Sequence, residues 1–229
     1  MKKILATSLF ILLFVAYSNA QDCVFFYPET KGAELEYKSY DSKDKLTGMS
    51  KQKIKDITKS GNTITAVIEV QYFDKNMKEL MHNDFTVKCE NGIFYLDMKN
   101  FMNPQSMGAI DNLEASVESS NLQLPSNMKA GDKLNDGSLT ITLSNNGMKM
   151  MNMTTNITNR VVQGKENMTT PAGTFDCFKI SSDISSKSII TVNVKSVEWY
   201  AKDVGMVKVE TYSSSGKLSG YTVLTSIEQ

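Results

Sequence analysis

Histidine and arginine are almost absent from this chain of 229 residues, which holds only His82 and Arg160 of these types, with three cysteines and four prolines. A Ser-His-Asp triad would depend on His82 alone, and no Gly-x-Ser-x-Gly segment is present to expose a serine nucleophile. Zinc sites need several closely spaced nitrogen or sulfur ligands, and phosphate loops need glycine motifs that the chain lacks. These absences predict a protein that is not an enzyme and that uses no metal and no cofactor.

A net charge is also missing, because 25 Lys and Arg side chains balance 25 Asp and Glu side chains. Without a net positive field we expect no binding of nucleic acid. After residue 20, no apolar run approaches the roughly 20 residues that a transmembrane helix needs, so the protein is not expected to span a membrane. A hydrophobic content of 41% excludes a wholly disordered chain.

The first twenty residues have the three parts of a secretion signal. A short basic start precedes an apolar stretch from Ile4 to Tyr17, and Ser18 and Ala20 are small residues suited to a cleavage site. We therefore expect residues 1–20 to be a signal peptide and residues 21–229 to form a single all-β domain. The destination is the periplasm, the cell surface or the extracellular space.

Three cysteines follow the signal, in a compartment that permits disulfides. We favour a Cys23–Cys89 disulfide that would fix the mature N-terminus to a strand and leave Cys177 buried. Three unpaired cysteines that act as small hydrophobic residues are the alternative. Lipid attachment at Cys23 is a further alternative, although Gln21-Asp22 places no small residue directly before it.

Alternation of apolar and polar side chains runs through most of the remaining sequence. Such patterning, rich in β-branched and aromatic residues, predicts strands that bury one face. It is clearest in segments 33–38, 64–72, 85–89, 139–143, 190–194, 207–209 and 221–227. Asn-Gly and Asp-Gly pairs between such segments indicate tight hairpins. We predict an antiparallel barrel or half-barrel of about ten to twelve strands, closed or half-closed to protect its edges.

The segment from Asn100 to Lys129 breaks this alternation. Met107, Ile110 and Val117 have roughly helical spacing, and Pro125 would end a helix. We expect one short helix or long loop that crosses the barrel, either as a lid over its mouth or as an ordinary connection.

Methionines are concentrated near one turn, where Met148, Met150, Met151 and Met153 stand close together. Thioethers favour Cu(I). In a strand, however, Met148 and Met150 would face away from Met151 and Met153, which disfavours a shared copper site. We interpret the methionines as flexible apolar filler of a core or cavity, and Met148 and Met150 as candidate contacts to a hydrophobic ligand.

Several stretches of the chain resemble the TapB-like family of exported proteins from Bacteroides-type bacteria, which is similar to a wider group of periplasmic half-barrel β proteins. These stretches are Leu124-Pro125, Gly131–Leu134, Asn159–Glu166, Thr170–Ile180 and Glu198–Lys208. The resemblance covers most of the chain after the signal and implies an all-β barrel or half-barrel. It implies no activity, so no catalytic residue can be transferred.

Two rare side chains in these stretches are further candidate ligand contacts. Arg160 could form a bidentate pair with Glu166 or Glu198 that joins two strands, or it could anchor a ligand. Trp199 and Tyr200 should fall on opposite faces of a strand, one in the core and one exposed.

These features favour an exported, non-enzymatic binding or carrier protein for a hydrophobic ligand, such as a lipid, or for an envelope component. Barrels of this size can hold one small ligand. The alternative is a structural, envelope-associated interaction protein with a filled core, which would pair with an envelope protein through a strand edge.

Overall fold

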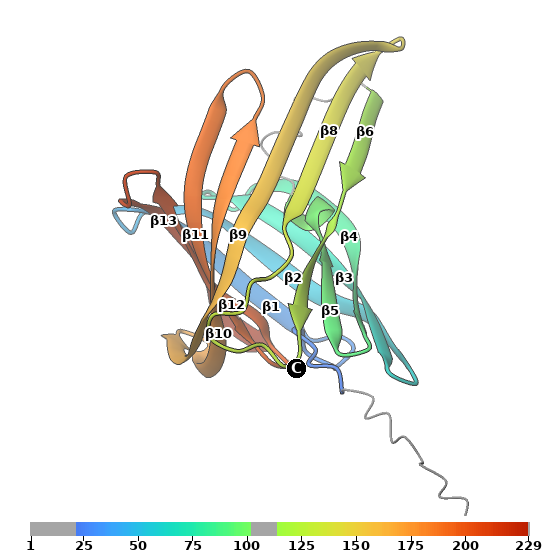
Figure 1. The fold of residues 1–229 in the computed structure, drawn as a ribbon, viewed down its shortest axis with the longest axis vertical. Coiled ribbons are helices and arrows are strands. Elements are labelled where there is room, and N and C mark those ends of the chain that lie inside the picture. Colours follow the sequence, from blue (N-terminus) through green and yellow to red (C-terminus); the bar gives the residue numbers. More distant parts are fainter. Residues whose placement is uncertain (1–21, 102–113, 229) are drawn as a thin grey trace, which may run out of the picture.

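The computed structural model describes residues 22–101 and 114–228, and nearly all of their regular structure is β-strand (Figure 1). The strands are β1 (Glu34–Asp41), β2 (Leu46–Ser60), β3 (Thr63–Asp74), β4 (Glu79–Glu90), β5 (Ile93–Asp97), β6 (Glu114–Ser119), β7 (Asn121–Pro125), β8 (Gly137–Asn145), β9 (Met148–Thr170), β10 (Gly173–Lys187), β11 (Thr191–Ala201), β12 (Gly205–Ser213) and β13 (Leu218–Glu228), with a 3-10 helix η1 (Met98–Phe101) after β5. The predicted signal peptide lies outside the described residues. Within the described ranges, no helix is long and apolar enough to cross a membrane.

All thirteen strands belong to one antiparallel sheet, in the order β6-β8-β9-β10-β11-β12-β13-β1-β2-β3-β4-β5-β7. The first and last strands of this order, β6 and β7, are separated by the single residue Ser120, so the sheet nearly closes on itself. The Ser120 N–H donates to the Ser138 carbonyl at 2.9 Å, and its carbonyl accepts from the Met98 N–H at 3.1 Å. The predicted all-β antiparallel barrel is confirmed, with thirteen strands rather than ten to twelve.

Because consecutive strands pair along most of the sheet, the turns alternate between the two ends of the barrel. The turns of hairpins β1–β2, β3–β4, β8–β9, β10–β11 and β12–β13 lie at one end, which we call the upper end. The turns β2–β3, β4–β5, β9–β10 and β11–β12 lie at the other, the lower end. Asn91-Gly92 and Asn146-Gly147 adopt the positive φ angles that tight hairpins require.

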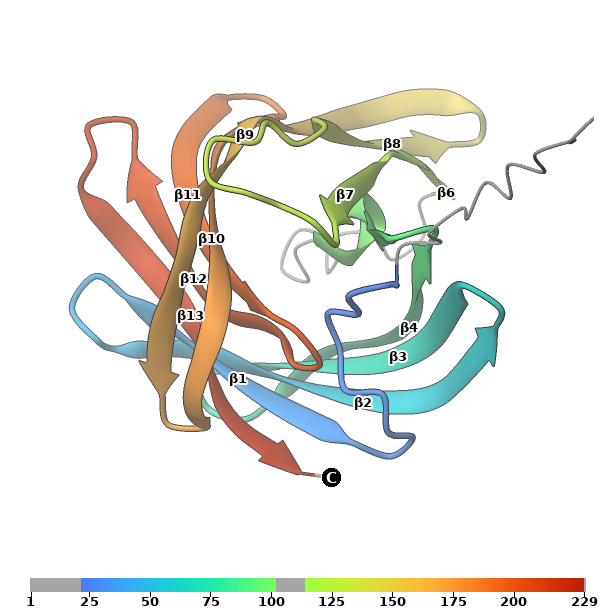
Figure 2. The ribbon, with the colours of Figure 1, turned by 60° about the horizontal axis from the view of Figure 1, so that its bottom comes forward.

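The segment that precedes β1, residues 22–33, packs across the lower end, and we call it the N-terminal plug (Figure 2). Phe25 and Phe26 are almost fully buried, and each makes an edge-to-face contact with Phe94 at 5.5 Å between ring centroids. Burying a phenylalanine contributes about 1.5–3 kcal/mol. Gly205 permits this packing, because a Cβ there would lie 2.8 Å from the Phe26 carbonyl oxygen.

A disulfide fastens the N-terminal plug to β4. It joins Cys23 to Cys89, with 5.9 Å between their Cα atoms, which is the pairing that the sequence favoured. Next to it, the Val24 N–H donates to Ser126 Oγ at 2.8 Å. Cys177 is a free, buried cysteine, and burial raises its pKa to about 12. Its thiol is therefore protonated at neutral pH.

The segment between Asn100 and Lys129, where a short helix or long loop was expected, is largely strand in the part that the structure describes, and the short helix η1 ends at Phe101. Residues 114–119 and 121–125 form strands β6 and β7, while Met107 and Ile110 lie outside the described residues. Val117 packs against the core, and Leu122 and Leu124 are buried. Each strand has only five or six residues, too few for their alternation to outweigh the helical spacing of the longer segment.

Candidate ligand cavity

The interior of the barrel above the N-terminal plug contains a cavity of about 540 Å³. Small-molecule sites commonly have volumes of roughly 300–1,000 Å³. Its aromatic lining residues are Phe26, Tyr27, Tyr37, Tyr72, Phe73, Phe85, Phe94 and Tyr200. Leu80, which lines the cavity close to the β3–β4 turn, is 42% exposed. Among the described residues, the cavity is therefore partly open toward the upper end.

Strand alternation places the lining side chains. In β2, Ser50 and Gln52 share a face, and their cross-strand partners in β3 are Tyr72 and Val70. Successive inward residues of neighbouring strands thus form one continuous wall. The wall is apolar and aromatic near the plug and gains serine and threonine hydroxyls toward the turns, from Ser39, Thr47, Ser50, Thr211 and Thr222.

A row of inward side chains crosses β2, β3 and β4. Val70 pairs with Gln52 on one side and with Asn83 on the other. Gln52 Oε1 and Asn83 Oδ1 are both buried and have no hydrogen-bond partner among the described residues. A buried carbonyl without a partner costs about 1–3 kcal/mol. Of the two, Gln52 lines the cavity and therefore offers a bound molecule a hydrogen-bond acceptor beside an apolar wall.

A carboxyl group also belongs to the cavity wall. Glu198 of β11 is 6% exposed, and the Ser196 hydroxyl donates to its Oε1 at 3.3 Å. Burial raises the pKa of Glu198 above its ordinary value of 4.5, although the positive charge of Arg160 opposes the shift. Of the residues described along the cavity, it is the single acidic one.

Tyrosine hydroxyls supply the remaining polar groups. Burial raises the pKa of Tyr27, Tyr37 and Tyr200, so their phenols stay neutral hydrogen-bonding groups at physiological pH. The cavity thus combines aromatic surface with neutral hydroxyls, one unpaired amide oxygen and one carboxyl of raised pKa. This combination suits a mainly apolar molecule that carries a few polar atoms.

Arg160 lies outside the cavity, in the seam between β9 and β7. Its Nη1 donates to the Asn135 carbonyl at 3.0 Å, and to the Gln123 carbonyl and Asn135 Oδ1 at 3.3 Å. The expected bidentate pair with a carboxylate is not formed with Glu198, which the guanidinium influences only through its charge. The side chain is 2% exposed and joins strands as a structural group. Its hydrogen bonds tie the segment before β8 to the closing seam.

Trp199 also lies outside the cavity. It falls on the opposite face of β11 from Tyr200, as predicted, but both residues are 4% exposed, so the expectation that one is exposed is wrong. The Trp199 indole is covered by a second apolar cluster that includes Cys177 and Val207. Its N–H donates to Glu166 Oε1 at 2.6 Å, which lowers the pKa of Glu166. The residue proposed as a pair for Arg160 therefore binds Trp199.

Met148 and Met150 are not among the residues that line the cavity. They begin β9 beside the β8–β9 turn and are 70% and 62% exposed. Met151 and Met153 face the opposite way and pack against the core. The predicted alternation is confirmed, but the face of β9 that was assigned to a cavity is turned to solvent, because the opposite face is the one that packs against the core. This part of β9 lies at the top of the barrel (Figure 1).

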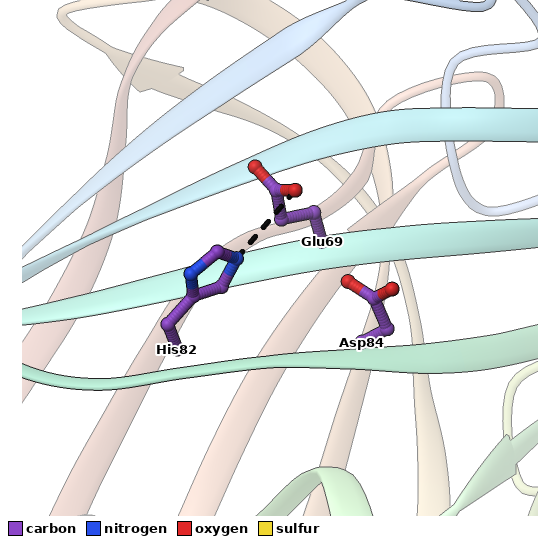
Figure 3. Close-up of side chains that lie close together, drawn as sticks. All are labelled: Glu69, His82 and Asp84. Carbon is purple, nitrogen blue, oxygen red and sulfur yellow. Dashed lines mark ion pairs between the residues drawn. The ribbon is translucent and has the colours of Figure 1, made fainter.

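A second cluster of polar groups lies on the outer surface of β3 and β4 (Figure 3). His82 Nε2 is 3.5 Å from Glu69 Oε2, and Asp84 lies beside them. Three such side chains could in principle hold a metal ion. However, Lys55 Nζ approaches Asp84 at 2.8 Å and Glu69 at 3.6 Å, so an ammonium group already neutralises both carboxylates. The cluster is best described as an exposed ion-pair network.

Comparison with models of known families identifies the family of this chain. Residues 30–224 match the DUF3108-like family. The chain belongs to this family. Among curated proteins, none matches the chain.

Two crystal structures of Bacteroidales proteins share the fold of this DUF3108-like chain. A candidate lipoprotein from Parabacteroides distasonis is 26% identical, with a TM-score of 0.78 over 91% of this chain and 100% of the other. A candidate exported protein with a YmcC-like fold, from Bacteroides fragilis, is 23% identical, with the same TM-score over 90% and 100%. The second similarity concerns the fold alone. The first relative, a candidate lipoprotein, supports an exported location for this DUF3108-like protein.

The sequence did not single out Gln52 or Glu198 as parts of a cavity. Gln52 does carry a signal, because it stands at a position where alternation predicts an inward apolar residue. Glu198 precedes the Trp199-Tyr200 pair and was considered only as a partner of Arg160. Its burial depends on the register of β11 with β10, which pairs it with Ile180.

Proposed function

We propose that this DUF3108-like protein is an exported, non-enzymatic binding protein whose barrel holds a mainly apolar ligand. One observation carries the proposal: a cavity of about 540 Å³, lined by eight aromatic residues, remains inside an otherwise well-packed barrel. Native interiors are close-packed, so an aromatic cavity of this size needs a reason. A bound molecule is the simplest one.

The unpaired amide oxygen of Gln52, which lines the cavity, supports a ligand with at least one hydrogen-bond donor. Its apolar body would fill the aromatic part of the cavity above Phe26 and Phe94. A lipid or another amphipathic envelope component has this chemistry. Export of the protein is consistent with such a role. The resemblance to the TapB-like family is also consistent with it, and membership of that family stays a prediction.

The absence of catalysis remains part of the proposal. It is supported by the position of His82 on the outer face of β4, where it pairs with Glu69, whereas Phe85 of the same strand lines the cavity. It is also supported by the Cys177 thiol, which burial keeps protonated.

Attachment of a lipid at Cys23 is not part of the proposal. The Cys23 sulfur is shared with Cys89 in a disulfide and is not free to carry a thioether-linked chain. We propose instead a mature protein that is released after cleavage near residue 20. The alternative, an envelope-associated interaction protein with a filled core, would leave no space for a ligand.

Native mass spectrometry of protein exported and purified without detergent tests this proposal. We expect an added mass of a small, mainly apolar molecule that is lost on denaturation and recovered by solvent extraction. A single species at the mass of the mature chain, together with failure to take up a fluorescent fatty acid, would favour the alternative.

A further inference from the structure

The upper ends of two hairpins carry exposed apolar side chains that the cavity does not use. Ile189, at the β10–β11 turn, is 93% exposed, and Ile190 beside it is 69% exposed. On the β8–β9 hairpin, Met148 and Met150 are 70% and 62% exposed. Hairpin turns are ordinarily formed by Gly, Asn, Asp, Ser or Pro. Two adjacent isoleucines at a turn therefore indicate a contact that the isolated chain does not make.

The exposed apolar side chains of the two hairpins lie at the same end of the barrel. Both hairpins turn at the upper end and extend farther than the other hairpins there (Figure 1). Val192, on β11 just below the isoleucines, is a further exposed apolar residue at 49%. The polar turns of β1–β2 and β12–β13, at the same end, stop short of them (Figure 1). A flat surface that approached the upper end would meet the apolar tips first.

Within the parts of the strands that form these tips the charged residues are lysines, although the whole chain is balanced at 25 against 25. No Asp or Glu lies between Gly137 and Lys165 or between Ile184 and Val197. Lys149 and Lys187 lie near the two turns, and Lys195 lies farther down β11. The neighbouring strand β6 adds the exposed Glu114, which pairs with Ser144 beside the β8–β9 turn, so lysines outnumber acidic residues there. Exposed apolar side chains next to lysines are the pattern that binds anionic lipid surfaces, where apolar groups enter the interface and cations contact headgroups.

We propose that the β8–β9 and β10–β11 tips dock the protein on an anionic phospholipid surface. Ile189 and Ile190 insert below the headgroups, Met148 and Met150 insert beside them, and Lys149 and Lys187 contact lipid phosphates. Because the cavity, as the described residues form it, opens toward the same end of the barrel, docking would bring that opening to the membrane. The docking itself does not require that the cavity hold a ligand.

Flotation with lipid vesicles tests this inference on the purified mature chain. We expect the protein to float with vesicles that contain about one third phosphatidylglycerol, to float weakly with pure phosphatidylcholine, and to be released by high salt because surface charges are screened. Ile189→Ser combined with Ile190→Ser should reduce the bound fraction roughly tenfold, because two large apolar groups no longer enter the bilayer.

A charge-matched pair of variants separates a specific lysine contact from general attraction. Lys149→Glu with Lys187→Glu should reduce binding to the phosphatidylcholine level. Lys129→Glu with Lys202→Glu makes the same change in net charge at exposed lower-end positions and should bind as wild type. Equal losses in the two double variants would overturn the proposal, and so would wild-type binding by the Ile189→Ser, Ile190→Ser variant.

Insertion of the β10–β11 tip into the bilayer can also be measured directly. A tryptophan introduced as Ile190→Trp should be quenched by brominated phospholipid, whereas one introduced as Ser215→Trp, on the polar β12–β13 turn, should not. The native Trp199 is buried and gives a constant background. No quenching of the first variant would overturn the proposal, as would an absence of vesicle binding in a folded protein that instead forms a stable complex with an envelope protein.

Discussion

At the scale of single residues, Glu198 is the group whose ionisation the fold most clearly opposes. Burial raises its pKa above 4.5, so the folded protein binds this proton more tightly than the unfolded chain does. The resulting stability is fully present below the unfolded pKa and is lost as the pH rises from that value through the raised folded pKa. At neutral pH the ionised carboxylate is therefore a cost to the fold, which Arg160 reduces only in part.

Glu198→Gln should remove this cost, since an amide of the same shape has no proton to lose. We expect the variant to gain stability relative to wild type as the pH rises from about 4 to 7, with little difference at the acidic end. Urea unfolding at several pH values measures the difference. Glu118→Gln on the exposed face of β6 is the control. Parallel stability curves for wild type and Glu198→Gln would contradict the assignment.

Individual residues also mark the limit of what the sequence could predict. Alternation correctly placed Trp199 and Tyr200 on opposite faces, but their burial depends on partners that lie far away in the sequence. Glu166, 33 residues from Trp199, accepts its indole N–H. Met148 and Met150 show the same limit, because a strand pattern cannot tell whether its apolar face meets a core or extends past it.

At the scale of elements, the N-terminal plug closes the lower end of the barrel. It has no strand pairing of its own across most of its length and relies on Phe25 and Phe26, on a few backbone hydrogen bonds and on the Cys23–Cys89 disulfide. The disulfide closes a loop with a sequence separation of 66 residues. In the chain-entropy account such a cross-link contributes about 4 kcal/mol.

Cys23→Ser combined with Cys89→Ser should therefore lower the free energy of unfolding by about 4 kcal/mol. It should also make the chain before β1 accessible to protease, because the plug loses its covalent tie. Denaturant unfolding and limited proteolysis measure the two effects. Cys177→Ala, which leaves the disulfide intact, should keep the plug protected. Unchanged protection in the double variant would show that packing alone holds the plug.

Long strands and their hairpins were predictable, because several consecutive alternating residues and an Asn-Gly or Asp-Gly turn agree with each other. The short strands β6 and β7 were not. Their five or six residues lie in a segment whose wider spacing looked helical, and their pairing partners, β8 and β5, are chosen by barrel closure. Local sequence carries little information on such a choice.

At the scale of the whole molecule, the barrel has two unlike ends. The lower end is closed by the aromatic plug and the disulfide, and Arg160 secures the seam between β9 and β7. The upper end bears the partly open cavity and the two apolar, lysine-flanked tips. Such a difference between the two ends suits a protein that takes up an amphipathic molecule at a lipid surface and encloses the apolar part of that molecule. A filled structural barrel would not need it.

The most direct test of this account is a titration of the purified mature chain with a fluorescent fatty acid, comparing wild type with Ser50→Phe and Ser60→Phe. Both substitutions are in β2, but Ser50 lines the cavity and Ser60 is exposed at the lower end. We predict saturable, near-stoichiometric binding by wild type and Ser60→Phe, and at least tenfold weaker binding by Ser50→Phe, because the added ring fills the cavity. Equal binding by the three folded proteins, or no saturable binding by wild type, would contradict the claim that the barrel interior is a ligand site.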